Sequence, residues 1–255
     1  MNNLPDFPVL VFVLTFFTLW LSVWIGAFYF RRQQKLKENV QRDLGVILAA
    51  TLTLLGLIIG FSFSMATNRY DQRKNYEEAE ANAIGTEYLR ADLLPAADAA
   101  RVRALLIKYL DQRVLFYTTR DKQQLAQIDA QTAQLQTEMW SAVRTPAAAQ
   151  PTPIAALAVS GMNDVLNSQG YTQAAWWNRI PIAAWCMMAA MAICSCLLIG
   201  YGTRDVKADP ILLLVLPLVV SIAFFLIADI DSPRGGVIHV NPQNLASLSE
   251  SLHAR

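Results

Sequence analysis

Charged side chains are scarce in this sequence, and their scarcity limits what the chain can be. Only 16% of the 255 residues are Asp, Glu, Lys or Arg, whereas 54% are hydrophobic. A soluble domain typically carries about 25% charged residues. The 21 basic residues nearly balance the 20 acidic ones and leave a net charge of +1. A chain this close to neutral lacks the basic surface that a nucleic-acid partner requires.

Residues that carry catalysis or hold metals are also few. The two histidines, His239 and His253, have no cysteine or carboxylate at ligand spacing, so we interpret both as surface residues. Cys186, Cys194 and Cys196 fall in one apolar run, which is typical of free thiols that pack as small apolar groups. The sequence contains no Gly-rich phosphate loop and no Gly-x-Ser-x-Gly motif. We therefore expect no enzyme, no cofactor and no metal site.

Four long uncharged runs dominate what is present. They cover residues 8–30, 44–67, 180–203 and 210–228. Each can cross a hydrocarbon core about 30 Å thick, which takes roughly 20 helical residues. The first run lacks a basic start and a cleavage site, so it is not a signal peptide. Because no ionisable residue lies inside any run, a proton-coupled transporter or an ion pump is disfavoured.

The sequence therefore predicts an all-α integral membrane protein. Four transmembrane helices form two hairpins, at residues 8–67 and 179–228, and an extramembrane helical domain at 68–178 separates them. Residues 229–255 form a C-terminal tail. Within the helical domain, three prolines in ten residues make 144–153 a linker, since proline is excluded from helix interiors. Apolar residues at helical spacing predict that the long second helix continues to Pro95 and that two more helices cover residues 102–116 and 125–143. A fourth, short helix is expected from Ile154 to Val165, and Trp176 and Trp177 are expected to anchor the return to the membrane.

One predicted helix runs from lipid into water without a break. From Asp43, a plausible N-cap, to Leu94 there is no proline, and at 1.5 Å per residue this makes a rod of about 78 Å. Seven of the twelve residues from Arg69 to Glu80 are charged. Opposite charges at i,i+4 spacing favour a solvated face, with a contact surface as the alternative; the pairs are Arg73 with Glu77 and Lys74 with Glu78.

Small and mildly polar residues recur along one face of this helix inside the membrane. Steps of three and four residues join Gly45, Ala49, Thr53, Gly56, Gly60, Ser64 and Thr67. Such residues let helix backbones approach closely. A sharper hypothesis is a pore-lining stripe around a symmetry axis, where hydroxyl groups and bare backbone meet water. Both interpretations hold if helices of several subunits pack around that axis.

Two motifs resemble bestrophins. An apolar helix with a Gly-Phe step, here Gly60-Phe61, continues into Tyr70-Asp71-Gln72-Arg73 and a charged helix. After the last run come the residues that match the segment following the last bestrophin span: Asp229, Asp231, Pro233, Gly235, Asn244 and Leu245. The pattern of two spans, a helical domain and two spans ending in Asp-x-Pro-x-x-Gly is similar to a bacterial and plant family of uncharacterised membrane proteins, the bestrophin-like domain family.

The resemblance implies a homo-oligomeric ion channel, pentameric in bestrophins, with the second span lining the pore. Its partners would be copies of itself, the lipid bilayer and small inorganic ions. Bestrophins narrow the pore with side chains at i+4 spacing, and two alignments are open here. Anchoring on Gly60-Phe61 selects Thr53, Leu57 and Phe61, whereas anchoring on Tyr70-Asp71 selects Gly56, Gly60 and Ser64. The alternative function is a membrane sensor or scaffold whose helical domain binds a partner or ligand without conduction.

Basic residues near the spans predict the orientation in a bacterial inner (plasma) membrane. The loop at residues 31–42 holds five Lys and Arg, and the loop at 204–209 adds Arg204 and Lys207. The flanks on the other side supply five basic residues over longer segments: Arg69, Arg73, Lys74, Arg179 and Arg234. Short loops count most, so both basic loops are expected in the cytoplasm, with the helical domain and both termini outside. The resemblance implies the opposite orientation, since bestrophins keep this domain in the cytoplasm.

The two motifs are expected to meet. An even number of spans separates the segment after the second span from the segment after the fourth, so both face one compartment. Basic residues of the first segment can then pair with acidic residues of the second. The candidate contact residues are Arg69, Tyr70, Asp71 and Arg73 in the first segment, with Asp229, Asp231 and Pro233 in the second. Two unrelated solvated ends are the alternative.

Overall fold

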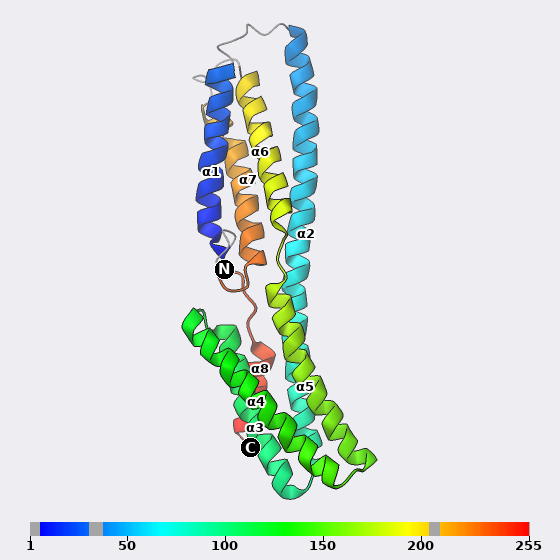
Figure 1. The fold of residues 1–255 in the computed structure, drawn as a ribbon. Helices are drawn as coiled ribbons and strands as arrows, with labels where there is room; N and C mark the ends of the chain where they lie inside the picture. The colour runs from blue at the N-terminus through cyan, green and yellow to red at the C-terminus, as the bar shows by residue number, and fades with distance from the viewer. Residues whose placement is uncertain (1–5, 31–37, 204–209, 255) are drawn as a thin grey trace. The chain divides into compact units, whose positions relative to one another are not determined.

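The computed structural model of this protein describes residues 6–30, 38–203 and 210–254, and it is helical throughout, with no strand in these ranges. The helices follow one another as in Figure 1: α1 (Pro8–Ile25), the π-helical η2 (Gly26–Phe30), α2 (Glu38–Arg90), the 3-10 turn η4 (Ala91–Leu93), α3 (Ala96–Thr118), α4 (Lys122–Ala149), α5 (Pro153–Trp177), α6 (Ile182–Gly202), α7 (Pro210–Asp231) and α8 (Gln243–His253). They form two compact units. Residues 1–70 and 179–239 make the membrane unit, and residues 71–178 and 240–255 make the helical unit.

The expected fold class is confirmed. Four helices in the described ranges are long and apolar enough to cross a membrane: α1, the first half of α2, α6 and α7. The basic loops used to predict the orientation, at residues 31–37 and 204–209, lie outside the described residues, so the orientation stays a prediction. The stretch expected as a separate tail, 229–255, is divided between the units, because α8 packs against α3 of the helical unit.

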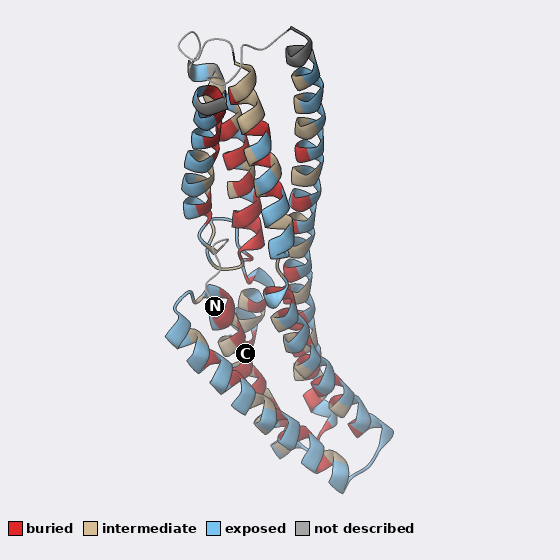
Figure 2. Cartoon of the chain, turned by 45° about the horizontal axis from the view of Figure 1, so that its top comes forward, coloured by how far each residue is buried: buried red, intermediate tan, exposed pale blue. Residues whose placement is uncertain are grey.

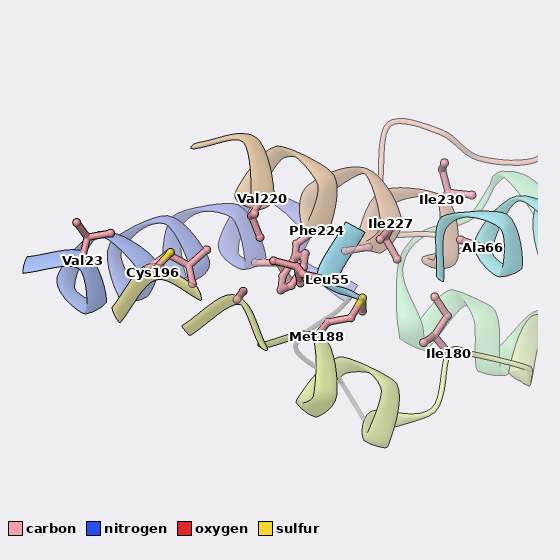
Figure 3. Close-up of a cluster of buried hydrophobic side chains, with 14 residues drawn as sticks. Val23, Leu55, Ala66, Ile180, Met188, Cys196, Val220, Phe224, Ile227 and Ile230 are labelled. Carbon is pink, nitrogen blue, oxygen red and sulfur yellow. The ribbon is translucent and has the colours of Figure 1, made fainter. Parts of the chain in front are cut away.

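The membrane unit is held together by an apolar core between its helices. α1 packs against α6 and α7, and α2 adds Leu55 and Ala66 to the shared cluster around Met188, Phe224 and Ile227 (Figure 3). Lipid tails are as apolar as these side chains, so the cluster is stabilised by close packing rather than by escape from water. All three cysteines lie on α6 as free thiols.

Two glycines bring α1 and α6 into backbone contact. A Cβ atom at Gly200 would overlap the carbonyl oxygen of Val23, and one at Gly26 would overlap that of Leu197. The two helices therefore touch at bare backbone, which is the close approach that small residues permit in membranes.

The long helix α2 begins earlier than expected. It starts at Glu38, so Asp43 lies inside the helix and its assignment as the N-cap was wrong. The helix continues without interruption to Arg90 and tightens into η4 just before Pro95. A proline disfavours helical geometry in the residue before it, which explains why the rod stops there.

The helical unit is built from the second half of α2 together with α3, α4, α5 and α8. Side chains cap two of its helices: Asp121 accepts a hydrogen bond from the amide of Gln124 (2.8 Å), and Thr152 accepts one from Ala155 (3.1 Å). Each cap satisfies one of the amides that a helix leaves open at its start. Pro153 follows Thr152 in the first turn of α5, where its missing N–H costs nothing.

The linker and the short helix expected next to it were wrong in extent. α4 continues to Ala149 and includes Pro146 in its last turn. Proline has no N–H to bond the carbonyl four residues earlier, so α4 continues there with one backbone hydrogen bond fewer. α5 is long, because no proline follows Pro153 until Pro181. Trp176, expected at the lipid interface, lies in the core of the helical unit against the rings of Phe116 and Tyr117, whereas Trp177 is exposed.

The solvated face expected after the second span was also partly wrong. Arg73, Glu77 and Glu80 are buried, whereas Lys74 and Glu78 are exposed. The three buried side chains lie on the face of α2 that the other helices of the unit cover. The i,i+4 spacing could not predict this burial. It shows that two charged residues share one face of the helix, and that face can be exposed or buried.

Candidate functional site

The small-residue stripe of α2 is uncovered along the membrane. Its residues are exposed from Gly45 to Ser64, and Thr67 is half-buried. Among the described residues, no atom outside the adjacent turns of α2 itself lies within 4 Å of the Cβ position of Gly45, Gly56 or Gly60. The Thr53 hydroxyl donates to the carbonyl of Ala49 (2.8 Å), so it stays on the helix surface without a partner helix. Figure 2 shows how little of this half of α2 is buried.

A different face of α2 holds the helix to the membrane unit. Leu55, Ser62 and Ala66 are buried and recur with helical spacing. At 100° per residue, the centre of this face lies roughly 130° around the helix from the centre of the stripe. Phe61 is 63% exposed and lies on neither face, roughly 110° from the stripe. One helix therefore presents a packed face and a free face made of glycine and hydroxyl residues.

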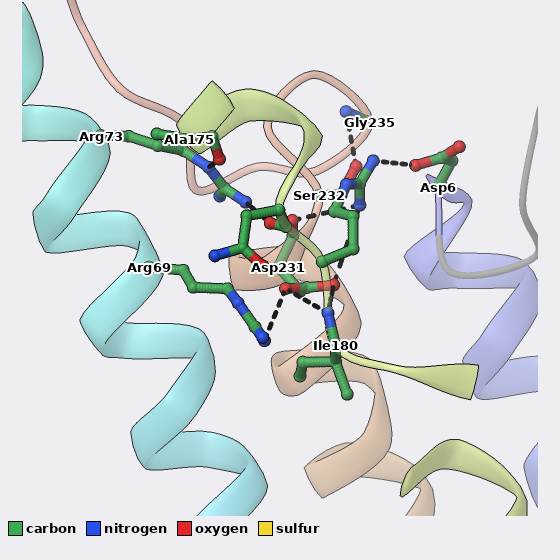
Figure 4. Close-up of polar contacts among 10 residues, drawn as sticks. Asp6, Arg69, Arg73, Ala175, Ile180, Asp231, Ser232 and Gly235 are labelled. Atoms are coloured by element: carbon green, nitrogen blue, oxygen red, sulfur yellow. Dashed lines mark hydrogen bonds and ion pairs between the residues drawn. The ribbon is translucent and has the colours of Figure 1, made fainter. Parts of the chain in front are cut away.

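The second site is an ionic cluster around Asp231, at the end of α7. Its carboxylate is 1% exposed and accepts from the amide of Ile180 at 3.3 and 3.2 Å (Figure 4). The guanidinium groups of Arg69 and Arg179 lie 3.8 and 3.9 Å from its oxygens. Arg179 also pairs with Asp6, just before α1. The Asp231 cluster therefore joins the ends of all four spans.

The loop after α7 folds back onto its own helix. Asp229 is buried, and its two oxygens accept from the amides of Val237 and Ile238 at 2.8 Å each. The hydroxyl of Ser232 accepts from the amide of Gly235 (3.0 Å). A Cβ atom at Gly235 would overlap the carbonyl oxygen of Asp6, so the loop passes close to the start of α1. The side chains of Asp229 and Ser232 thus fix the backbone of the loop that follows α7.

The candidate contact residues have different surroundings. The structure brings Arg69 and Asp231 together, while Tyr70 is half-buried against the core of the membrane unit and Asp71 is exposed. Arg73 belongs to the helical unit, where its guanidinium donates to the carbonyls of Ala175 (3.3 Å) and Asn178 (3.4 Å). Pro233 is half-buried in the loop.

Sequence reasoning missed two members of the Asp231 cluster, Asp6 and Arg179. The signal was present, since Asp6 precedes the first span and Arg179 precedes the third. By the same count of spans that relates Arg69 to Asp231, both lie at the same side of the membrane. Arg179 entered the sequence analysis only as a charge that sets orientation.

Two of the buried acids of the helical unit, Glu77 and Glu80, have hydrogen-bond partners. The carboxylate of Glu77 caps α8 by accepting from the amide of Leu245 (2.9 Å) and the side chain of Asn244 (2.7 Å). Glu80 pairs with Arg113, both fully buried, and accepts from the Thr172 hydroxyl (3.2 Å). Both acids therefore fix helices of the unit to α2.

No metal site is present in the described parts of the chain. No group of three His, Cys, Asp or Glu side chains among these residues could hold a metal ion. His239 is exposed, and His253 lies at the surface 3.5 Å from Asp111. Burial, with the nearby Glu80 carboxylate, raises the pKa of Tyr109 and Tyr117, so both phenols stay protonated.

The fold and these sites define a four-span helical membrane protein with a free helix face and an ionic cluster at one end of the spans. The sequence model of the bestrophin-like domain matches residues 13–245, so the chain belongs to the bestrophin-like family. A search of curated proteins finds no significant match.

Solved structures share the fold over nearly the whole chain. A bacterial bestrophin homologue from Klebsiella pneumoniae, phased with zinc, is 14% identical with a TM-score of 0.64 and covers 96% of this chain and 97% of its own. A single-residue variant of a Klebsiella pneumoniae homologue is 12% identical with a TM-score of 0.66, over 96% of this chain and 97% of its own. At such low identity the similarity establishes the fold.

Proposed function

We propose that this protein is one subunit of a homo-oligomeric, bestrophin-like ion channel in which α2 lines the central axis. The observation that carries the proposal is the free stripe of α2. A membrane helix gains nothing from turning glycine and hydroxyl residues toward lipid, whereas those residues allow close packing between copies and contact with water. Family membership over residues 13–245 supports the same function.

The chemistry of the stripe suits passage rather than tight binding. It offers hydroxyl oxygens and accessible backbone but no charge, so a small inorganic ion could keep most of its water while passing. Conduction requires binding weak enough to release the ion. We propose no selectivity from the stripe itself, because it contains no ring of charged side chains.

The test is ion flux into liposomes that contain the purified protein. Gly56→Leu and Gly60→Leu place bulk on the stripe, so each is expected to abolish flux or to break the oligomer, which light scattering detects. Ala190→Leu places the same leucine side chain at an exposed position of α6 and serves as the control. Unchanged flux and mass in both glycine variants would place the stripe against lipid and refute the proposal.

A second variant distinguishes the two candidate constrictions. If Thr53, Leu57 and Phe61 form the narrowest level, then Phe61→Ala widens it and raises single-channel conductance. If the narrowest level is formed by Gly56, Gly60 and Ser64, Phe61→Ala leaves conductance unchanged. Absence of any flux from a stable wild-type oligomer would favour the sensor or scaffold function instead.

A further inference from the structure

One carboxyl group of the helical unit is buried without a hydrogen bond. Glu87, in the last turn of α2, is 0% exposed, and neither of its carboxyl oxygens has a partner among the described residues. Glu77 and Glu80, on the same helix, are buried but satisfied. A buried carboxylate without partners is costly, and the group takes up a proton instead. Glu87 therefore needs a proton to be buried, whereas Glu77 and Glu80 are buried with partners.

The carboxyl group is held in place by a glycine of α5. A Cβ atom at Gly161 would overlap the Oε2 atom of Glu87 and would lie 2.6 Å from the Nη1 atom of Arg90. The acid thus packs directly on the backbone of α5. This contact covers the carboxyl group and excludes water from it.

The charged groups around Glu87 compensate its charge only in part. Arg90, one turn further along α2, lies 3.8 Å from Asp164 of α5. On α3, Arg103 is engaged by the backbone carbonyl of Tyr88 and the side chain of Asp92. The buried face of α4 toward the bundle is apolar at this end of the helix: Met139, Ala142, Val143 and Pro146.

These surroundings favour the neutral acid. Burial raises the pKa of Glu87 to about 8, Arg90 partly opposes the rise, and Asp164 adds to it. When α5 is packed, the acid is therefore mainly protonated at neutral pH. If α5 moves away, water reaches the carboxylate, and the pKa of Glu87 returns toward its ordinary value of 4.5.

We propose that Glu87 is a proton-dependent latch: while it is protonated, the first half of α5 packs against the end of α2, and loss of the proton favours their separation. In the closed state the neutral carboxyl group lies beneath Gly161. In the open state the proton has left to bulk water, and the carboxylate is hydrated and faces Arg90. α5 can separate locally, because a non-helical connection, Gln150–Thr152, precedes it and its first turns leave Ile154 and Leu157 exposed.

The pH window follows from the two pKa values. Below about 4.5 both states are protonated, and opening does not depend on pH. Between about 4.5 and 8 only the closed state holds the proton, so the opening equilibrium constant rises about tenfold per pH unit. Above about 8 neither state is protonated, and the dependence disappears.

The experiment measures hydrogen exchange in the full-length protein between pH 5 and 9. For amides between Ala155 and Ser168, the protection factor, which is corrected for the intrinsic rate at each pH, should fall about tenfold per pH unit and level off above pH 8. Glu87→Gln keeps the shape but cannot ionise, so its protection should be independent of pH. Glu78→Gln changes an exposed acid of the same helix and should retain the wild-type dependence.

A second measurement uses the unmodified protein, in case Glu87→Gln does not fold. The infrared band of a protonated carboxyl group should be present at pH 7 and lost with a midpoint near 8. A pH-independent protection factor in the wild type, or an unchanged slope in Glu87→Gln, would overturn the latch. The readouts concern the helical unit alone, so failure of the channel proposal leaves this test unaffected.

Discussion

Replacing Asp231 by asparagine tests whether the ionic cluster holds the spans together. The substitution keeps the size of the side chain and leaves one oxygen to accept from the Ile180 amide. It removes the charge that faces Arg69 and Arg179. Arg69 is only 14% exposed, and its Nη1 atom has no hydrogen-bond partner among the described residues. The ion pair with Asp231 is therefore what compensates this charge.

The size of the effect follows from the distance and the burial. Two unit charges 3.8 Å apart attract by about 4 kcal/mol at an effective dielectric constant of 20. Removing one partner of a buried pair typically costs about 3–5 kcal/mol, because the other charge stays buried. Arg179 adds less, since it is more exposed and keeps Asp6 as a partner. We expect a loss of about 4 kcal/mol.

The assay is thermal unfolding of the purified protein in detergent. A loss of this size lowers the melting temperature by about 10 °C in a chain of this length. Asp71→Asn, an exposed acid on α2 close to Arg69, is the control and should change the melting temperature by less than about 2 °C. Combining Asp231→Asn with Arg69→Met should cost less than the sum of the two single changes.

Two results would refute this reasoning. If Asp231→Asn melts within about 2 °C of the wild type, the carboxylate does not compensate a buried charge. If the losses of the single variants add in the double variant, Arg69 and Asp231 are not coupled. The two side chains would then lie close together without stabilising each other.

Two further predictions concern orientation and packing. A cysteine at Gln34 should be shielded from an impermeant thiol reagent in intact cells, and one at Gln150 should be labelled; the reverse pattern would give the orientation that the bestrophin resemblance implies. Gly200→Ala should lower the melting temperature by several degrees, because the added carbon meets the Val23 carbonyl, whereas Gly202→Ala, which has open space, should not.

The long uncharged runs were sufficient to predict the number and order of the spans. Uncharged runs of this length have one stable solution in lipid, a helix, so their positions follow directly. The end of α2 was predicted almost as well, since Pro95 limits it. The predicted start of α2 was wrong, because the helix extends beyond the apolar run into polar residues and no residue type marks where it begins.

The positions of buried charges could not be predicted from spacing. Arg73, Glu77 and Glu80 lie in a run that resembles a solvated face, yet each binds a partner more than 30 residues away in sequence. A local pattern carries no information on such partners. Trp176 shows the same limit, because an aromatic residue near a span is suited equally to the lipid interface and to a protein core.

Two kinds of contact fix how the helices of the membrane unit pack, and both bear on the role of α2. Between α1 and α6 the specific contacts are glycines that bring backbones together, and at one end of the spans they are the charges around Asp231. α2 shares the ionic end through Arg69 and buries Leu55 in the core, which fixes its rotation. Because the rotation of α2 about its own axis is fixed, the face opposite these contacts always points away from the core. The glycine stripe is therefore held in one direction, as a surface between identical copies would need.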